Sequence, residues 1–318
     1  MKLRRFLLIV TLVMSILVLS SCVREPEHRT YDINESFSGI RVDIDTAELK
    51  IVPTSGKAKV VCEGDFTVEV KDGSLQVTEI NDQKSWLERI FIKDEYEVTV
   101  YLPEAEYETL SIECDTGEVD IEEVTVKTVT VTVDTGDIEL SGITSESIGI
   151  SNDTGAIDVE NCRADIFDIK NDTGKVELSD IECSSIKAVN ETGMIKITGA
   201  VADEAYIEVE TGDIRLEGVV VSGRLTITSD TGDIRIEDVV ASGRLTITSD
   251  TGDISFRRCD GGEVYITANT GDVRGSFLTD KIIFAESDTG RVDVPHLTSG
   301  GKCEITTDTG NINITIEN

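Results

Sequence analysis

Apolar and polar residues alternate in short runs along most of this chain, and the runs come in pairs separated by a glycine-containing triplet. In LTITSDTGDIRI (225–236), Leu225 and Ile227 precede the triplet Asp-Thr-Gly, and Ile234 and Ile236 follow it. Alternation with a period of two is the pattern of a β-strand with one buried face, and a glycine between two such runs is typical of a turn. The pattern therefore predicts a unit of strand, turn and strand.

The unit recurs eleven times with a spacing of 19 or 20 residues. Its triplets begin at residues 115, 134, 153, 172, 191, 210, 230, 250, 269, 288 and 308; the first residue is Glu at 191 and 210, Asn at 269 and Asp elsewhere. A further apolar position falls nine residues after each of the first ten starts, at Val124, Ile143, Cys162, Ile181, Ala200, Val219, Val239, Cys259, Leu278 and Leu297. A period this regular indicates a repeat architecture.

So short a unit cannot bury its apolar face alone, whereas equivalent strands stacked in parallel enclose a continuous narrow core. We therefore expect an all-β fold, a single-chain parallel β-solenoid (β-helix) of about 11 clear 19–20-residue coils plus degenerate N-terminal coils. The string SGRLTITSDTGDI is identical at 222–234 and 242–254, which indicates recent duplication.

The triplet also raises a catalytic alternative, because Asp-Thr-Gly surrounds the catalytic aspartates of pepsin-like proteases. Those enzymes share one proton between two carboxylates, whereas eleven triplets in register fit a turn. Glycine supplies a positive φ, and we expect the aspartate to accept hydrogen bonds from backbone N–H groups just ahead of it. We thus predict structural turn roles, and no catalytic residues, for Asp115, Gly117, Asp134, Gly136, Asp153, Gly155, Asp172, Gly174, Gly193, Gly212, Asp230, Gly232, Asp250, Gly252, Gly271, Asp288, Gly290, Asp308 and Gly310.

Residues 39–110 resemble the same repeat in a more divergent form, ahead of the regular repeats of 111–318. Segment 40–51 fits one coil and 66–77 fits another loosely, but 78–95 breaks the period and contains the one tryptophan, Trp86. We expect that insertion to be a helix that covers the solenoid, or else a patch for a ligand or partner. At the other end, Ile312 and Ile314 lie directly after a triplet, which predicts an open terminal coil with unpaired backbone groups.

The first residues have the pattern of a bacterial lipoprotein signal peptide. Basic residues precede an apolar run at 6–19, and LSSC (19–22) matches a lipoprotein signal peptidase site. The run is shorter than the roughly 20 residues that a membrane-spanning helix needs. We therefore expect residues 1–21 to be removed, Cys22 to carry lipid, and 22–38 to form a polar tether in a protein anchored to a membrane of the bacterial cell envelope, outside the cytoplasm.

Charge narrows the possible partners. Removal of the three basic residues of the signal leaves 26 of the 29 Lys and Arg residues against 62 Asp and Glu, a net charge of −36. So acidic a surface repels nucleic acid. The partners that we expect are the membrane, through the N-terminal lipid, and an unknown envelope protein or surface ligand.

Little in the sequence points to catalysis or to metal binding. The two histidines, His28 and His296, cannot form a triad or a multi-histidine site. Stacked triplet aspartates could hold calcium, but the nine-residue glycine-rich pattern of calcium-binding solenoids is absent, so we expect no metal and no cofactor. Arg215, Arg235 and Arg274 each follow an aspartate by two residues, which predicts a ladder of mixed charge on one face.

The cysteines show no framework of disulfide spacings. Cys162, Cys259 and Cys303 occupy inward positions and should behave as small buried hydrophobic residues. Cys162 and Cys183 lie in adjacent coils, near enough that a disulfide between them stays open as an alternative.

The repeated unit L-x-I-x-x-D-T-G-D-I-x-I, together with YEVTVYLPEAEYETLSI (96–112), resembles the DUF4097 β-strand-repeat proteins, also described as toastrack domains or candidate adhesins. The resemblance covers roughly residues 40–318. It implies a cell-envelope β-solenoid associated with membrane stress or surface attachment, and it assigns no catalytic residue.

We therefore expect a non-enzymatic, lipid-anchored envelope protein that acts as an adhesion or interaction module, or as a spacer. One alternative is a sensor or scaffold of an envelope-stress system, with 78–95 as its contact. Another is a carbohydrate-active β-helix enzyme, but Tyr206, Phe256 and Tyr265 are scattered rather than clustered with carboxylates.

Overall fold

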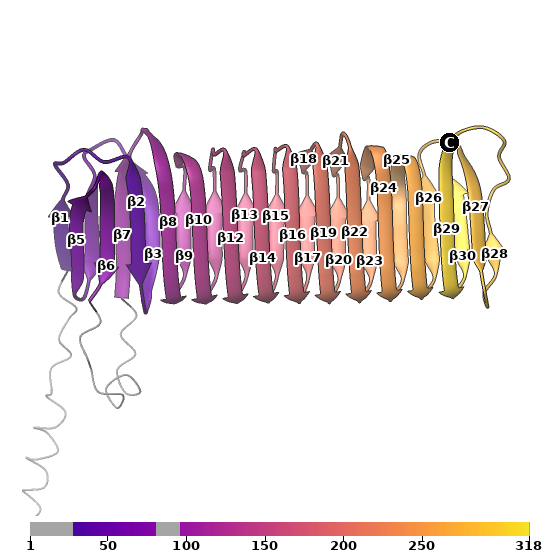
Figure 1. The fold of residues 1–318 in the computed structure, drawn as a ribbon, viewed down its shortest axis with the longest axis horizontal. Coiled ribbons are helices and arrows are strands. Elements are labelled where there is room, and N and C mark those ends of the chain that lie inside the picture. The colour runs from indigo at the N-terminus through magenta and orange to yellow at the C-terminus, as the bar shows by residue number, and fades with distance from the viewer. Residues whose placement is uncertain (1–27, 81–95, 318) are drawn as a thin grey trace, which may run out of the picture.

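The computed structural model describes residues 28–80 and 96–317, and in these ranges every regular element is a β-strand. Figure 1 shows a straight rod of stacked coils, with the first strands at one end and the last at the other. Among these residues no helix is long and apolar enough to cross a membrane. Most of the insertion predicted at 78–95, with Trp86, falls at 81–95, and the signal peptide and Cys22 fall before residue 28, so these predictions lie outside the described residues.

Each coil contributes one strand to each of two parallel sheets. The front sheet, which faces the viewer in Figure 1, contains the strands that end at the triplets: β8 (Glu106–Thr116), β10 (Thr125–Thr135), β12 (Ser147–Thr154), β14 (Ile166–Thr173), β16 (Ser185–Thr192), β19 (Glu204–Thr211), β22 (Arg224–Thr231), β24 (Val240–Thr251) and the second half of β25 (Ile254–Thr270). The back sheet contains the strands that follow the triplets: β9 (Val119–Glu122), β11 (Ile138–Ser141), β13 (Ile157–Glu160), β15 (Val176–Ser179), β17 (Ile195–Thr198), β20 (Ile214–Glu217), β23 (Ile234–Glu237), the first half of β25 and β26 (Val273–Phe277).

Equivalent positions of successive coils lie side by side. Ile150 is the register partner of Val131 on one side and of Ile169 on the other, and Ile157 likewise pairs with Ile138 and Val176. Isolated bridges such as Thr125 to Thr144, together with β18 (Val201–Ala202) and β21 (Val220–Val221), form a third, very narrow row. The predicted parallel β-solenoid is confirmed.

The alternating apolar residues fill the space between the two sheets. Inward residues such as Phe167 and Ile227 are fully buried, and the third apolar position is buried from Val124 through Cys259. The last two positions differ: Leu297 is only half-buried, and Leu278 is 36% exposed while the neighbouring Phe277 occupies the core instead. The register shifts between β25 and β26 at this point, which exchanges the side of the sheet that the two residues face.

The N-terminal end confirms one predicted coil and corrects another. β2 (Gly39–Ile44) and β3 (Ala47–Thr54) form the coil predicted at 40–51 and pair in parallel with β8 and β9. Segment 66–77 is not a parallel coil, because β5 (Phe66–Lys71) and β6 (Ser74–Glu79) form an antiparallel hairpin. The Asp-Gly pair between them favours a tight hairpin turn.

Two further antiparallel strands close this end. β4 (Lys59–Glu63) pairs with β7 (Tyr96–Pro103), and β1 (His28–Asp32) pairs with β4. Part of the segment expected to be a polar tether is therefore a strand. Its Tyr31 side chain packs against the core. The insertion also begins later than residue 78, since β6 runs to Glu79.

At the C-terminal end the coils are stacked out of sequence order. β29 (Gly301–Thr309) lies between β25 and β27 (Lys281–Ser287), and β30 (Ile312–Ile316) lies between β26 and β28 (Val292–Asp293). The last coil of the chain is therefore internal and the preceding one is outermost. The open terminal coil predicted at Ile312 and Ile314 is wrong, because both residues are buried.

The exchanged order of the last two coils has a simple physical reason. Cys303, Ile305, Ile312 and Ile314 present a complete apolar face, which is best buried between two neighbouring coils. The coil of β27 and β28 has a two-residue back strand, and its Val292 is 38% exposed. The less complete coil thus takes the position with a single neighbour.

Candidate interaction surfaces

The triplet glycines form the first corner of each coil. From Gly117 to Gly271 their φ angles lie between 136° and 155°. A Cβ added to Gly212 would lie 1.8 Å from the carbonyl oxygen of Gly193, and one added to Gly232 would lie 1.9 Å from that of Gly212. The corner therefore requires glycine both for its backbone angle and for the close approach of the neighbouring coil. Gly290, in the outermost coil, lacks the positive φ.

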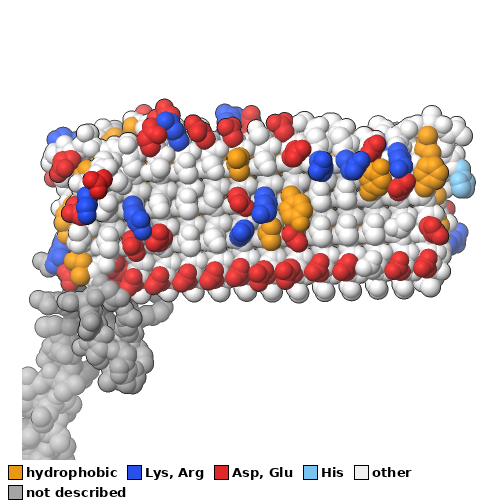
Figure 2. Space-filling view, viewed as in Figure 1, with side chains coloured by type: hydrophobic (Ala, Val, Ile, Leu, Met, Phe, Trp, Pro, Cys, Tyr) orange, Lys and Arg blue, Asp and Glu red, His pale blue; other side chains and the backbone are white. Residues whose placement is uncertain are grey.

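The first residues of the triplets stand in single file along this edge. Thr135 is the register partner of both Thr116 and Thr154, and the preceding aspartates follow the same register. Figure 2 shows the resulting row of acidic side chains along the lower edge, with one interruption. Burial and the charges of Asp45 and Asp134 raise the pKa of Asp115.

These carboxylates do not close the turn as the sequence predicted. Asp250 accepts one hydrogen bond, from the Asn269 side chain at 3.0 Å; within the described ranges, the other triplet carboxylates accept none. The triplet carboxylates stand one per coil in a line and do not converge. The described residues contain no group of three or more His, Cys, Asp or Glu residues placed to hold a metal ion.

Buried asparagines hold this corner from the inside. The Asn152 side chain donates to the carbonyl oxygen of Gly136 at 2.9 Å, and Asn171 and Asn190 repeat the contact in the next two coils. Their Oδ1 atoms have no partner. Sequence reasoning missed this role, although asparagine precedes the triplet in three consecutive coils.

A second corner, eight residues after each of the first eight triplet starts, was also missed. Here φ lies between 51° and 67°, at Glu123, Gly142, Asn161, Asp180, Gly199, Gly218, Asp238 and Arg258. The signal in the sequence was the recurrence of Gly, Asn and Asp, which are the residues that adopt this left-handed conformation most readily. This corner has room for a side chain, since the nearest atom to a Cβ on Gly218 is 3.9 Å away.

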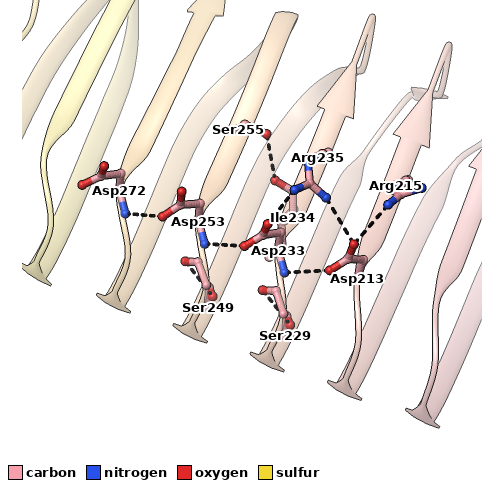
Figure 3. A network of polar contacts seen from close by, with 12 residues as sticks. Asp213, Arg215, Ser229, Asp233, Ile234, Arg235, Ser249, Asp253, Ser255 and Asp272 are labelled. Atoms are coloured by element: carbon pink, nitrogen blue, oxygen red, sulfur yellow. Dashed lines mark hydrogen bonds and ion pairs between the residues drawn. The ribbon is translucent and has the colours of Figure 1, made fainter.

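The aspartate that follows the triplet glycine makes the hydrogen bonds expected of the triplet aspartate. Asp213 Oδ1 accepts the backbone N–H of Asp233 at 3.1 Å, Asp233 accepts that of Asp253 at 2.9 Å, and Asp253 accepts that of Asp272 at 2.9 Å. Figure 3 shows this chain of contacts running from coil to coil. The carboxylate thus links successive coils at the first corner.

Arginines two residues further on complete the predicted mixed-charge ladder. Arg235 contacts Asp213 at 3.2 Å and Asp233 at 2.6 Å. Burial opposes ionisation of Asp213, but the N–H of Asp233 and the guanidinium groups of Arg215 and Arg235 outweigh it and lower the pKa. The N–H of Asn311 has the largest part in lowering the pKa of Asp272.

The outer face of the back sheet changes character along the rod. Its N-terminal half is acidic, and burial together with neighbouring carboxylates raises the pKa of Glu139 and of Asp158. Its C-terminal half carries the ladder, beside a hollow of about 330 Å³ lined by Lys196, Arg215, Arg235 and Arg257 among others. These cations are already paired with carboxylates.

Most of the cysteine side chains in the described residues are buried. Cys162, Cys259 and Cys303 are buried in the core, as predicted. Burial raises the pKa of Cys259 to about 11 and that of Cys303 to about 12. Cys162 and Cys183 are both free thiols, so the disulfide alternative does not hold in this structure.

Comparison with known proteins identifies the family. The model of the Toastrack DUF4097 family matches residues 37–218 and 194–318. No curated protein matches the chain.

Several solved structures match the chain at low identity and with low TM-scores. One named a "putative adhesin" from Parabacteroides merdae is 11% identical, with a TM-score of 0.40, and the alignment covers 80% of this chain and 97% of the other. A second "putative adhesin", from Bacteroides fragilis, is 14% identical, with a TM-score of 0.31 and coverage of 92% and 98%. A "putative lipid binding protein" from Parabacteroides distasonis is 14% identical, with a TM-score of 0.40 and coverage of 92% and 98%. On the family match, which spans nearly all of the described residues, this chain belongs to the Toastrack DUF4097 family.

Proposed function

We propose that the protein is a non-enzymatic adhesion or interaction module of the bacterial cell envelope, held at a membrane by lipid on Cys22. The observation that carries the proposal is the unbroken stack of coils, which presents the same outward positions again and again along a rod. Strands spaced about 4.8 Å apart make each outward row a straight, regularly spaced array.

The arrangement of the triplets supports a role outside catalysis. A pepsin-like site needs two carboxylates facing each other across a cleft, whereas here the aspartates stand in one file on an exposed edge. The buried thiols carry raised pKa values, which disfavours the reactive thiolate.

The anchor is tested at Cys22. In cells that express the Cys22→Ser variant, we expect no lipid labelling and release of the chain from the membrane fraction, because the residue supplies the acylated atom. Retention of the variant in membranes, at the level of the unchanged chain, would contradict the lipoprotein proposal.

The adhesive role is tested with beads that carry the full chain. We expect them to attach to bacterial or host surfaces more strongly than beads carrying the chain with Gly212→Val, which disrupts the first corner. Equal attachment would contradict the role. Attachment that is kept in Gly212→Val but lost when residues 81–95 are deleted would favour the envelope-stress scaffold instead.

A further inference from the structure

Arg224 stands out among the cations of this acidic protein. It lies at the start of β22 on the outer face of the front sheet and is exposed. Of the arginines in the described ranges, it alone makes neither an ion pair nor a hydrogen bond; the partners of the others are all carboxylates. The net charge is −33, so an unpaired guanidinium is not explained by any shortage of acidic neighbours.

The duplicated string provides an internal comparison. Arg244 occupies the same position in the identical copy one coil further on, and it is the register partner of Arg224. Arg244 contacts Glu263 at 2.9 Å and lies 4.9 Å from the centre of the Tyr265 ring. The same local sequence therefore yields one satisfied arginine and one free arginine, and the difference comes from the neighbouring coils.

The free arginine lines a hollow that also contains an exposed aromatic ring. This hollow of about 230 Å³ is lined by Ser185, Lys187, Glu204, Tyr206, Arg224 and Thr226 among others. Tyr206 is 37% exposed, and its hydroxyl donates to Glu208 at 2.8 Å. Lys187 is held only weakly, since its Nζ lies 3.9 Å from Asp168.

A strip of hydroxyl groups continues from this hollow along the rod. Register places Lys187, Tyr206, Thr226, Thr246 and Tyr265 in one row across five coils. Tyr206 and Tyr265 are three coils apart, about 14 Å at the strand spacing of parallel sheets. Figure 2 shows this part of the front face: apolar side chains stand at the ends of a stretch without acidic groups, and cations lie along its upper side with an acidic group at each end of their row.

From this arrangement we infer that the strip beginning at Tyr206 and Arg224 is a binding site for a short acidic saccharide. The inference deepens the proposed adhesive function and rests on it. A pyranose ring stacks on the exposed Tyr206 ring, its carboxylate is bound by the guanidinium of Arg224 and by Lys187, and the following sugars lie over the threonine hydroxyls toward Tyr265. Sugar units repeat along an extended glycan at nearly the spacing of the coils, so one unit meets one coil.

The chemistry of the strip favours a sugar over an extended peptide. A peptide that binds by strand addition needs a sheet edge with free backbone groups, and this strip lies in the middle of a sheet whose strands are paired on both sides. Hydroxyls, a ring face and one unpaired guanidinium are instead the groups that bind the polar edge, the apolar face and the carboxylate of an acidic sugar.

The test is calorimetric titration of the full chain, kept in a mild detergent at near-physiological salt, with trigalacturonic acid. Maltotriose serves as the neutral sugar and inorganic phosphate as the simple anion. We expect Arg224→Gln to weaken the binding of trigalacturonic acid about tenfold or more, as for a lost charge-assisted contact. Arg244→Gln is the matched control and should change the affinity less than about threefold, because its guanidinium is already paired. Tyr206→Thr, which installs the residue found at 226 and 246, should weaken the binding of either sugar.

Each outcome of these titrations either supports or contradicts the saccharide site. Loss with Arg224→Gln and Tyr206→Thr, retention with Arg244→Gln, and weaker binding of maltotriose and phosphate would support the site. Equal loss in both arginine variants, binding of phosphate as tight as that of the sugar, equal binding of the two sugars, or no binding of trigalacturonic acid would overturn it. Attachment of chain-coated beads in the absence of trigalacturonic acid binding would overturn this site and leave the adhesive function standing.

Discussion

At the scale of single residues, the two corners of a coil impose different requirements although both contain glycine. The triplet glycine has φ near 140° and no room for a Cβ, whereas the later corner has φ near 60° and accepts Asn, Asp, Glu or Arg. This difference explains why glycine recurs in every triplet but alternates with other residues at the second corner.

The contrast predicts unequal costs for two substitutions in one coil. Gly212→Ala should lower the free energy of unfolding by about 3 kcal/mol or more, because its Cβ would meet the Gly193 carbonyl oxygen. Gly218→Asn should cost about 1 kcal/mol or less, since Asn161 already occupies the equivalent corner. Denaturant unfolding followed by circular dichroism measures both changes, and similar losses in the two variants would contradict this account of the corners.

Sequence reasoning could identify the triplet glycines because they recur at a fixed period, and it placed nearly all the inward residues. It assigned the turn hydrogen bonds to the wrong carboxylate. Which carboxylate forms these hydrogen bonds depends on which side chain points along the rod axis. The sequence alone does not show that orientation for Asp230 or for Asp233. The sequence also could not show that Arg224 lacks an ion-pair partner, because an identical string of residues surrounds Arg244, which has one.

At the scale of elements, both ends of the rod depart from simple stacking in sequence order. At the N-terminal end the first coil, β2 and β3, is internal, and β6 and β7 lie outside it. At the C-terminal end β29 and β30 lie inside β27 and β28. Periodicity predicts which residues form a coil, but it does not state the order of coils, because every coil presents the same apolar face to either neighbour.

A buried ion pair joins the exchanged coils. Lys281, at the start of β27, is 2% exposed and reaches past β29 to contact Asp260 of β25, while it also donates to Thr279 at 2.8 Å. Gly301 leaves room for this side chain, since a Cβ there would lie 3.3 Å from the Lys281 Nζ. The lysine therefore ties the outermost coil to one that is two positions away.

Removal of this tie should loosen the outermost coil selectively. In Lys281→Gln we expect faster amide hydrogen exchange in β27 and β28 and little change in β30, which keeps a neighbour on the inner side. Exchange is measured by mass spectrometry of peptic fragments, with the exposed Lys302→Gln as the control. Equal protection of β27 in the Lys281 variant and the unchanged chain would refute the tie.

At the scale of the whole molecule, the two halves of the rod differ in how the pKa values of their carboxylates are shifted. Carboxylates of the N-terminal half, such as Glu139 and Asp158, have raised pKa values, whereas those of the ladder, such as Asp213 and Asp272, have lowered ones. A raised pKa in the folded state means that protonation favours folding, so this contribution grows as the pH falls through that pKa. A lowered pKa means that the contribution is lost as the pH falls through it.

The melting temperature should therefore rise when the pH is lowered from 7 and pass through a maximum. The rise belongs to groups such as Glu139, which titrate above the ordinary value of 4.5, and the fall belongs to Asp213 and Asp272, which titrate below 3.8. Melting curves between pH 7 and about 3 measure this. Glu139→Gln should reduce the rise without moving the fall, and stability that declines steadily from pH 7 would contradict the assignment.

Composition predicts that the surface of the rod is acidic. It does not predict that the back sheet is acidic in one half and carries paired charges in the other, because this division depends on register. Asp158 and Arg215 occupy equivalent outward positions in different coils, and their surroundings differ only because their neighbouring coils differ. The signal peptide and Cys22 remain predictions from the sequence.

We propose that this rod works by attachment while it is anchored at its N-terminal end. The most direct measurement is the retention of cells under flow on a surface to which the unchanged chain confers attachment, compared with cells that make Cys22→Ser in equal amount. The substitution lies outside the coils, so the solenoid should remain intact and only its anchorage should change. We predict that the variant lowers retention to the level of cells without the protein; retention equal to that of the unchanged chain would contradict the claim.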